Sequence, residues 1–423
     1  MIKLIHLKST YLFLFLLLNF QLISCAQKKV QDSKMEIQSS KNETLEIKTG
    51  AEQTNLYLDL LKGKKVGIVA NQTSVLSVLQ RSEVAPNVMG SKKVMHHLVD
   101  YLHNYGGITV TKVFSPEHGF RGKADAAELI KDGVDTKTGL PIISIYGKSK
   151  KPSAKQLEGI DVMVFDIQDV GARFYTYISS LHYVMEACAE NGIPVIILDR
   201  PNPNAHYIDG PILEMEHTSF VGKHPVPVVY GMTIGEYGQM INGEKWLKNG
   251  IQCDLKVIPN NNYTHNSKYS LAIKPSPNLP NDKSINLYPS LGFFEGTTIN
   301  AGRGTEFQFQ RYGAPFFKKT GFSYSPQANE GAKYPKHKGK LCYGVDLSKT
   351  PHLSKIDLSF LMDAYKQTPK TEKFFGETFT IHAGTKKLQK QLEQGLSAEE
   401  IRASWVNGLE KFKIVREKYL IYE

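Results

Sequence analysis

A carboxyl group and an imidazole stand side by side in the segment Ser115-Pro116-Glu117-His118-Gly119. A glutamate whose surroundings raise its pKa can donate a proton near neutral pH, which is what general acid–base catalysis requires. Pro116 restricts the turn, and Gly119 lets the backbone approach a ligand closely. We therefore predict Glu117 as a general acid or base and His118 as a substrate-binding residue. The structural alternative is a loop whose glutamate caps a neighbouring helix.

The densest group of polar and aromatic side chains lies in FDIQDVGARFYTYIS, residues 165–179, which contains Asp166, Asp169, Arg173 and Tyr175. An aspartate beside an arginine keeps a low pKa and stays ionised, whereas a glutamate in a drier place becomes the acid. Two carboxyls with pKa values pushed apart are what glycoside hydrolysis needs. Asp169, or Asp166 in its place, is the candidate second carboxylate, with Arg173 and Tyr175 lining a sugar pocket. Alternatively, an Asp–Arg pair only shapes this loop.

Two further arginines and two glutamates come later in the chain. Arg200 in LDRPNP and Arg303 in NAGRGT are forked donors that suit a carboxylate. Glu295 in FFEGT is a candidate third carboxyl at the junction of two domains. Thr233 and Glu236 have the spacing of a capping box, so we expect Glu236 at a helix start rather than in the site.

A parallel sheet is the element that must position these residues. From residue 65 short β-branched runs alternate with amphipathic helices, which is typical of βαβ units. The expected strands are 66–69, 110–114, 141–145, 162–165 and 195–198, and a helix is expected over 176–190. Ligands of such sheets bind outside the carboxyl ends of the strands. Asn71, Glu117, Asp166 and Arg200 each follow a strand, so we expect them to converge on one rim.

The second half of the chain departs from this alternation. We predict an α/β fold with a Rossmann-like domain and a mostly parallel sheet over residues 51–290, and a smaller α+β domain over 291–423. Further helices are expected at 92–105, 233–247, 357–367 and 397–409, further strands at 255–258 and 419–422, and long ordered loops over 274–316.

Several motifs that would indicate other chemistry are absent from the sequence. It has no GxGxxG after the first strand, no Walker A spacing and no GxSxG elbow, so we expect no nucleotide cofactor and no serine nucleophile on such an elbow. The spacing of His96, His97 and His103 does not match a zinc motif. The net charge is +11, but there is no nucleic-acid-binding signature. Cys188, Cys253 and Cys342 show no CxxC spacing and are expected as buried thiols.

The N-terminus has the features of a bacterial lipoprotein signal peptide over residues 1–25. Lysines precede an apolar run over 11–20, and Leu22-Ile23-Ser24-Cys25 follows. We expect Cys25 to be lipidated, so that the protein is exported and anchored in a membrane facing the periplasm. Residues 26–50 are polar and lysine-rich and predict a flexible tether. An ordinary secretory signal with an incidental cysteine is the alternative.

Nine sequence blocks resemble the NamZ-like exo-β-N-acetylmuramidases, a bacterial family of peptidoglycan glycoside hydrolases. They are TGAEQ (49–53), GKKVGIVANQTS (63–74), FSPEHGFRG (114–122), TGLPIISIYG (138–147), DVMVFDIQDVGARFYTYISSL (161–181), VIILDRPNP (195–203), GMTIGE (231–236), SPNLP (276–280) and FFEGTTINAGRGT (293–305). The resemblance implies a site in the cleft between the two domains. It also implies release of terminal N-acetylmuramic acid (MurNAc) from the non-reducing end of peptidoglycan-derived saccharides in which it precedes N-acetylglucosamine (GlcNAc).

The same resemblance implies a role for Glu117 as the catalytic glutamate. Family members often carry histidine where this chain has Tyr230, and serine where it has Asn300. MurNAc bears a lactyl carboxylate that GlcNAc lacks, and Arg303 between two glycines is the candidate reader of that group. Two alternatives stay open: a metal-dependent hydrolase that holds one cation with Glu117, His118, Asp166 and Asp169, and a non-catalytic lipoprotein that binds wall sugars.

Overall fold

A computed structural model describes residues 46–81, 91–121, 132–319 and 321–423. The predicted signal peptide, its Cys25 and most of the predicted tether lie outside these residues. The last residues of the predicted tether are described and make contacts: Lys48 pairs with Asn261, and the Gly50 amide donates to the Asp199 carbonyl at 2.8 Å. Within the described residues, no helix combines the length and apolar character needed to cross a membrane.

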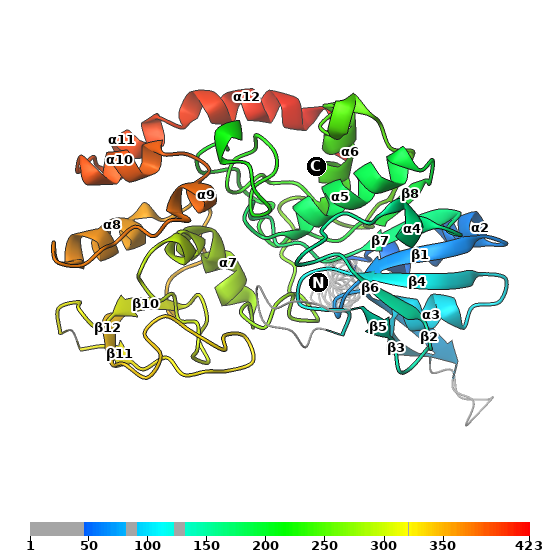
Figure 1. Cartoon of the computed structure of the whole chain (residues 1–423), viewed down its shortest axis with the longest axis horizontal. Helices are drawn as coiled ribbons and strands as arrows, with labels where there is room; N and C mark the ends of the chain where they lie inside the picture. The colour runs from blue at the N-terminus through cyan, green and yellow to red at the C-terminus, as the bar shows by residue number, and fades with distance from the viewer. Residues whose placement is uncertain (1–45, 82–90, 122–131, 320) are drawn as a thin grey trace, which may run out of the picture. The chain divides into compact units, whose positions relative to one another are not determined.

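A seven-stranded sheet forms the centre of the first half, with strand order β5-β6-β4-β1-β7-β8-β9 (Figure 1). Its parallel strands are β1 (Lys65–Ala70), β4 (Thr109–Ser115), β6 (Pro141–Ser144), β7 (Val162–Asp166), β8 (Val195–Leu198) and β9 (Leu255–Ile258). The short β5 (Gly133–Val134) adds an antiparallel edge. The predicted parallel sheet is therefore confirmed.

Successive side chains of the central strands enter two different hydrophobic clusters, because they point to opposite faces of the sheet. Phe165 of β7 joins a large cluster with α5 (Tyr177–Glu190) and α6 (Ile234–Gly243). Val164, one residue earlier, joins a smaller cluster with α3 (Leu98–His103) and α2 (Leu58–Leu61). Each strand can bury both faces, which fits its nearly continuous apolar sequence.

The start of α6 has the predicted capping box. The Thr233 amide donates to Glu236 Oε2 at 2.8 Å, and the Glu236 amide donates to Thr233 Oγ1 at 3.3 Å. The Thr233 hydroxyl also donates to Asp199 at the end of β8, at 2.7 Å. Glu236 thus stabilises a helix start, as its spacing indicated.

The second half contains a small antiparallel sheet and several short helices. The sheet orders β10 (Arg311–Ala314), β12 (Cys342–Asp346) and β11 (Ser323–Tyr324). The helical elements are α7 (Asp282–Leu291), η5 (Gly292–Gly296), α8 (Leu358–Gln367), α9 (Phe379–Ala383), α10 (Lys387–Glu393), α11 (Ala398–Ala403) and α12 (Val406–Glu417). The large hydrophobic cluster continues from β1 to α12, so the core crosses the domain boundary predicted at residue 290. The boundary itself stays a prediction.

Three predicted elements are wrong. Residues 92–105 do not form one helix: β3 (Ser91–His97) pairs with β2 (Val75–Arg81) as an antiparallel ladder before α3 begins. His96 and His97 therefore lie on a strand.

Helix α7 occupies part of the stretch expected as loops, and its Asn281 cap accepts from the Ser284 amide at 2.9 Å. Residues 419–422 form no strand.

The remaining described elements are short. They are η1 (Gly50–Glu52), η2 (Thr54–Leu56), α4 (Ala154–Leu157), η3 (Met215–His217) and η4 (Lys248–Gly250). Cys188, Cys253 and Cys342 are free and buried, as expected.

Candidate active site

A cavity of about 330 Å³ opens at the carboxyl ends of β4 and β6. Its volume lies in the usual range for a small-ligand site. Aromatic rings form much of its wall, contributed by Phe174, Tyr175, Phe220, Tyr288 and Phe309. Its charged and titratable lining residues include Glu117, His118, Lys150, Glu295, Arg303 and His382. The wall thus combines apolar faces with a few polar groups, as ligand pockets do.

Glu117 is held in this cavity by two hydroxyl groups. Tyr146 donates to Glu117 Oε1 at 2.9 Å, and Thr176 donates to Oε2 at 2.6 Å. Glu117 is 8% exposed, so its carboxyl is shielded from bulk water but stays in the cavity wall. His118, the next residue, adopts a left-handed conformation with φ of 71°, a strained geometry for a non-glycine residue. The loop after β4 therefore places a fixed carboxyl in the cavity.

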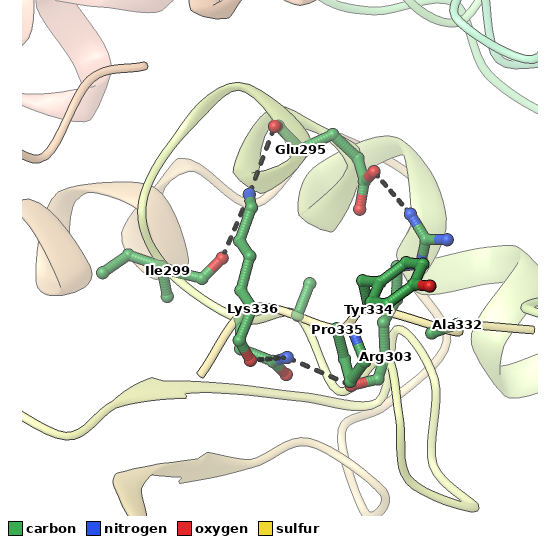
Figure 2. A pocket seen from close by; sticks show the side chains of 9 residues that line it. Glu295, Ile299, Arg303, Ala332, Tyr334, Pro335 and Lys336 are labelled. Atoms are coloured by element: carbon green, nitrogen blue, oxygen red, sulfur yellow. Dashed lines mark hydrogen bonds and ion pairs between the residues drawn. The ribbon is translucent and has the colours of Figure 1, made fainter. Parts of the chain in front are cut away.

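Glu295 is the second carboxylate of the wall. It comes from η5, and its Oε2 accepts from Arg303 at 2.9 Å (Figure 2). Burial alone would raise the pKa of Glu295, but Arg303 and Lys336 more than offset it, so its pKa lies below the ordinary value. The Lys336 ammonium also donates to the Glu295 carbonyl at 3.2 Å and to that of Ile299 at 3.5 Å. Glu295 is therefore kept ionised.

The negative charges of Glu117 and Glu295 both act on the same buried tyrosine, Tyr288. The pKa of this buried tyrosine lies well above its ordinary value because of burial, and then because of the negative charges of Glu295 and Glu117. Tyr175, a predicted pocket residue, lies in the same wall and donates to the Pro275 carbonyl at 2.7 Å. Glu295 and Arg303 also line a smaller adjoining pocket of about 260 Å³, which is the one drawn in Figure 2.

Asp166 and Arg200 form an ion pair with each other, and neither residue lines the cavity. Arg200 Nε donates to Asp166 Oδ1 at 2.6 Å, and Nη2 donates to Oδ2 at 2.9 Å. Burial raises the pKa of Asp166, and the guanidinium opposes that shift. Asp166 is fully buried and Arg200 is 4% exposed. This position corrects the expectation that both face the sugar, since a buried bidentate pair leaves neither group directed at a ligand.

Asp169 lies in the core with a different set of partners. Its Oδ2 accepts from the Tyr230 hydroxyl and from the Gly171 amide, the latter at 2.7 Å. Burial raises the pKa of Asp169 to about 6, although these bonds favour the ionised form. The Tyr230 hydroxyl is thus used to bind Asp169. The residues that line the cavity do not include Asp169.

Among the described residues, Arg173 has no aspartate partner. Its guanidinium is completely buried and donates to the carbonyls of Pro211 and Val226, each at 2.8 Å, and of Ala383 at 2.7 Å. These acceptors belong to distant parts of the chain, including the end of α9. Burial lowers the pKa of Arg173 to about 9. Its position outside the cavity wall corrects the predicted sugar contact and favours a structural role.

Asn71 supports the site from behind. Its amide donates to the Tyr177 hydroxyl at 2.8 Å, and that hydroxyl donates to the Glu117 carbonyl at 3.4 Å. Of the predicted residues, the structure thus brings Glu117, His118, Tyr175, Glu295 and Arg303 together in the wall. Tyr146 and Lys150 were not predicted as site residues, although both follow a predicted strand. No pattern in the sequence pointed to Phe220.

The geometry does not support the metal-dependent alternative. Asp166 is committed to Arg200, and Asp169 is bonded to Tyr230 and Gly171. Among the described residues, the acidic and histidine side chains close enough to share a cation are Glu214, Glu216 and His217 instead. Lys387 and Lys386 contact the two glutamates of that group. We therefore assign no cation site to the group of Glu214, Glu216 and His217.

Comparison with known proteins identifies relatives over nearly the whole described chain. Residues 66–283 match the family model for the N-terminal domain of exo-beta-N-acetylmuramidase NamZ, and residues 286–422 match the model for its C-terminal domain. The peptidoglycan beta-N-acetylmuramidase NamZ of Bacillus subtilis (strain 168) is 38% identical over 410 residues, covering 90% of this chain and 94% of that protein.

Two solved structures of DUF1343 family proteins from Bacteroides fragilis NCTC 9343 are also similar. One has a TM-score of 0.78 at 43% sequence identity, and the other has a TM-score of 0.71 at 28% identity. Each comparison covers 89% of this chain and 99% of the other. The sequence and the fold therefore each have relatives that match most of this chain.

Proposed function

The chain belongs to the exo-β-N-acetylmuramidase NamZ family, and from this premise we propose that Glu117 and Glu295 are its catalytic carboxyls. The protein is an exo-acting glycoside hydrolase that releases terminal MurNAc from the non-reducing end of peptidoglycan fragments. The observation that carries the assignment is that both carboxyls line one cavity with aromatic walls. Glycoside hydrolysis uses such a pair.

Glu117 acts as the general acid in this proposal. It gives its proton to the glycosidic oxygen as the bond from that oxygen to C1 of MurNAc breaks. Tyr146 and Thr176 fix the carboxyl at 2.9 and 2.6 Å, so the proton is delivered from a defined position. The backbone carbonyl of Glu117 is tied to Tyr177, which further limits movement of the loop.

Glu295 is the partner that stays ionised. The Arg303 guanidinium beside it keeps the pKa of Glu295 low despite burial. An ionised carboxylate can take a proton from the attacking water, which inverts the anomeric configuration, or attack C1 itself, which retains it after hydrolysis. In either case a hydroxyl from water ends on C1. Proton NMR of the first product anomer distinguishes the two courses.

We propose further that Cys25 carries a lipid and that the enzyme faces the periplasm from a membrane. The support is the sequence LISC after an apolar run, followed by a polar segment.

The direct test compares Glu117→Gln and Glu295→Gln with the matched control Glu306→Gln, which changes an exposed glutamate on the Arg303 loop. Release of MurNAc from a MurNAc-GlcNAc disaccharide is followed by chromatography. Each active-site change should lower turnover at least 10²-fold, the lower range for a general acid or base. The control should act like the wild type.

Circular dichroism and thermal unfolding show whether each variant is folded. A folded Glu117→Gln enzyme with near-normal turnover would remove Glu117 from the acid role. The same result for Glu295→Gln would return the second-carboxylate role to Asp169.

A further inference from the structure

The enzyme must cleave the bond at C1 of MurNAc and must also bind the lactyl carboxylate of this sugar. The catalytic pair accounts only for the cleavage. The sugar carries a lactyl carboxylate on O3, two ring carbons from the C1 where the bond is cut. The wall already contains the carboxyl groups of Glu117 and Glu295, of which Glu295 is ionised. A further negative group enters such a wall favourably only where a cation receives it, since burying an unpaired charge is costly.

Four basic side chains line the cavity: His118, Lys150, Arg303 and His382. Arg303 already has an anionic partner, because it donates to Glu295 at 2.9 Å and to the Gly331 carbonyl at 3.0 Å. A substrate carboxylate bound there would compete with the carboxylate that the proposed reaction needs. Burial lowers the pKa of His382, which favours its neutral form. Neither residue therefore suits a second anion.

Among the described residues, Lys150 contacts no carboxylate. Its ammonium donates to the Gly147 carbonyl at 3.2 Å and lies over the Phe220 ring, 5.2 Å from the centroid. A carbonyl and an aromatic face orient a cation without neutralising it. The neighbouring Lys151 differs, because it pairs with Glu186 and Glu190 at 2.8 and 2.7 Å. Lys150 thus keeps its charge available to the cavity.

The position of Lys150 is tied to that of the general acid. Its loop follows β6 and also carries Tyr146, whose hydroxyl donates to Glu117. The Tyr146 ring packs against Phe220 with centroids 5.7 Å apart, and Phe220 lies under Lys150. The loop therefore sets a cation and the acid's hydrogen-bond partner in one wall, separated by an aromatic ring.

From this arrangement we propose that Lys150 binds the lactyl carboxylate of MurNAc and so selects MurNAc over GlcNAc. This inference rests on the proposed function and goes beyond it, since it names the residue that reads the distinguishing group. Arg303 then serves the reaction by keeping Glu295 ionised and in place, which replaces the expectation that Arg303 reads the lactyl group.

The test uses Lys150→Met, Lys150→Arg and the control Lys148→Met, which changes an exposed lysine of the same loop. Turnover is measured on a chromogenic β-N-acetylmuraminide, on its uncharged lactyl carboxamide and on the β-N-acetylglucosaminide. A charge-assisted hydrogen bond of the usual strength predicts a loss of about 10- to 150-fold in kcat/KM for Lys150→Met on the muraminide alone. Lys150→Arg should recover most of it, and the control should lose nothing.

Each other outcome has a definite meaning. If Lys150→Met slows all three substrates equally, the residue only supports the loop, and the inference is wrong. If Arg303→Met instead lowers the muraminide rate selectively, Arg303 is the reader. A wild-type enzyme that fails to cleave the muraminide would contradict the proposed function itself, so the two failures are distinguishable. Binding of free MurNAc and GlcNAc to the Glu117→Gln form, with and without Lys150→Met, repeats the comparison without turnover.

Discussion

Asp169 shows how a buried carboxyl can resemble a catalytic one in a sequence. Its pKa rises to about 6 because of burial, and a perturbed acid is a common sign of an active site. Its partners, however, are Tyr230 and the Gly171 amide, and it does not line the cavity. Its raised pKa therefore has a consequence for stability that can be measured apart from catalysis.

The change Asp169→Asn should flatten part of the pH dependence of unfolding. The folded-state pKa near 6 exceeds the ordinary 3.8, so between these values the folded protein keeps a proton that the unfolded chain has lost. Stability from this group is present at low pH and is lost as the pH rises towards 6, by about 3 kcal/mol at roughly 1.4 kcal/mol per pKa unit. The asparagine does not titrate.

Urea unfolding of both proteins from pH 4 to pH 8 measures the difference in slope. Asp199, whose pKa burial raises to about 7, contributes in the same direction and remains in both proteins. We also expect Asp169→Asn to keep turnover of the wild-type order. An unchanged slope contradicts the titration argument, and abolished turnover in a stable variant favours Asp169 over Glu295.

Residues at strand ends were predictable, but their exposure was not. The rule that ligands bind at the carboxyl ends of parallel strands led to Glu117, which lines the cavity. It also selected Asp166 and Arg200, which the central strands β7 and β8 carry into the core, where the two neutralise each other. Lys150 and Phe220 lie on irregular loops, whose conformations depend on contacts between segments distant in the sequence.

At the scale of elements, the start of α6 offers a clean measurement. Thr233 accepts from the Glu236 amide and donates to Asp199 at 2.7 Å. Thr233→Ala removes both bonds and should lower the free energy of unfolding by about 1 to 2 kcal/mol, the usual cost of a lost N-cap. Thr233→Ser keeps the hydroxyl and should cost much less.

Chemical denaturation of the two variants and the wild type measures this difference. Since α6 supplies no side chain to the cavity wall, the kcat of each folded variant should stay close to that of the wild type. Equal stability of the alanine and serine variants would show that the hydroxyl does not support the helix.

Periodicity predicted the sheet and most helices but failed where two patterns overlap. Val94, Leu98, Val99 and Leu102 have helical spacing, yet the first part of the segment pairs with β2. That pairing depends on a partner strand, which a local pattern does not contain. Helix α7 was hidden by Pro289 inside it and by its polar residues. The first error comes from a tertiary contact that outweighs local propensity, and the second comes from the composition of the helix itself.

At the scale of the whole molecule, Cys25→Ser should release the protein from the membrane without harming catalysis. Lipidation needs the cysteine thiol, whereas every residue proposed for the site belongs to the folded part. Fractionation followed by a muraminide assay should find the variant in the soluble fraction with wild-type kcat. Retention in the membrane fraction would contradict lipid anchoring, and a stable but inactive soluble form would contradict independence of the anchor.

The cavity wall begins with Glu117 and ends with His382, so its parts are far apart in the chain. A ribosome delivers these parts in order, from the amino end onwards. When Glu117 and even Glu295 have been synthesised, the growing chain still lacks α9 and the carbonyl of Ala383 to which Arg173 donates. The nascent protein is therefore unable to complete its site until nearly all of it has been synthesised, which delays the appearance of hydrolytic activity until the chain is almost finished.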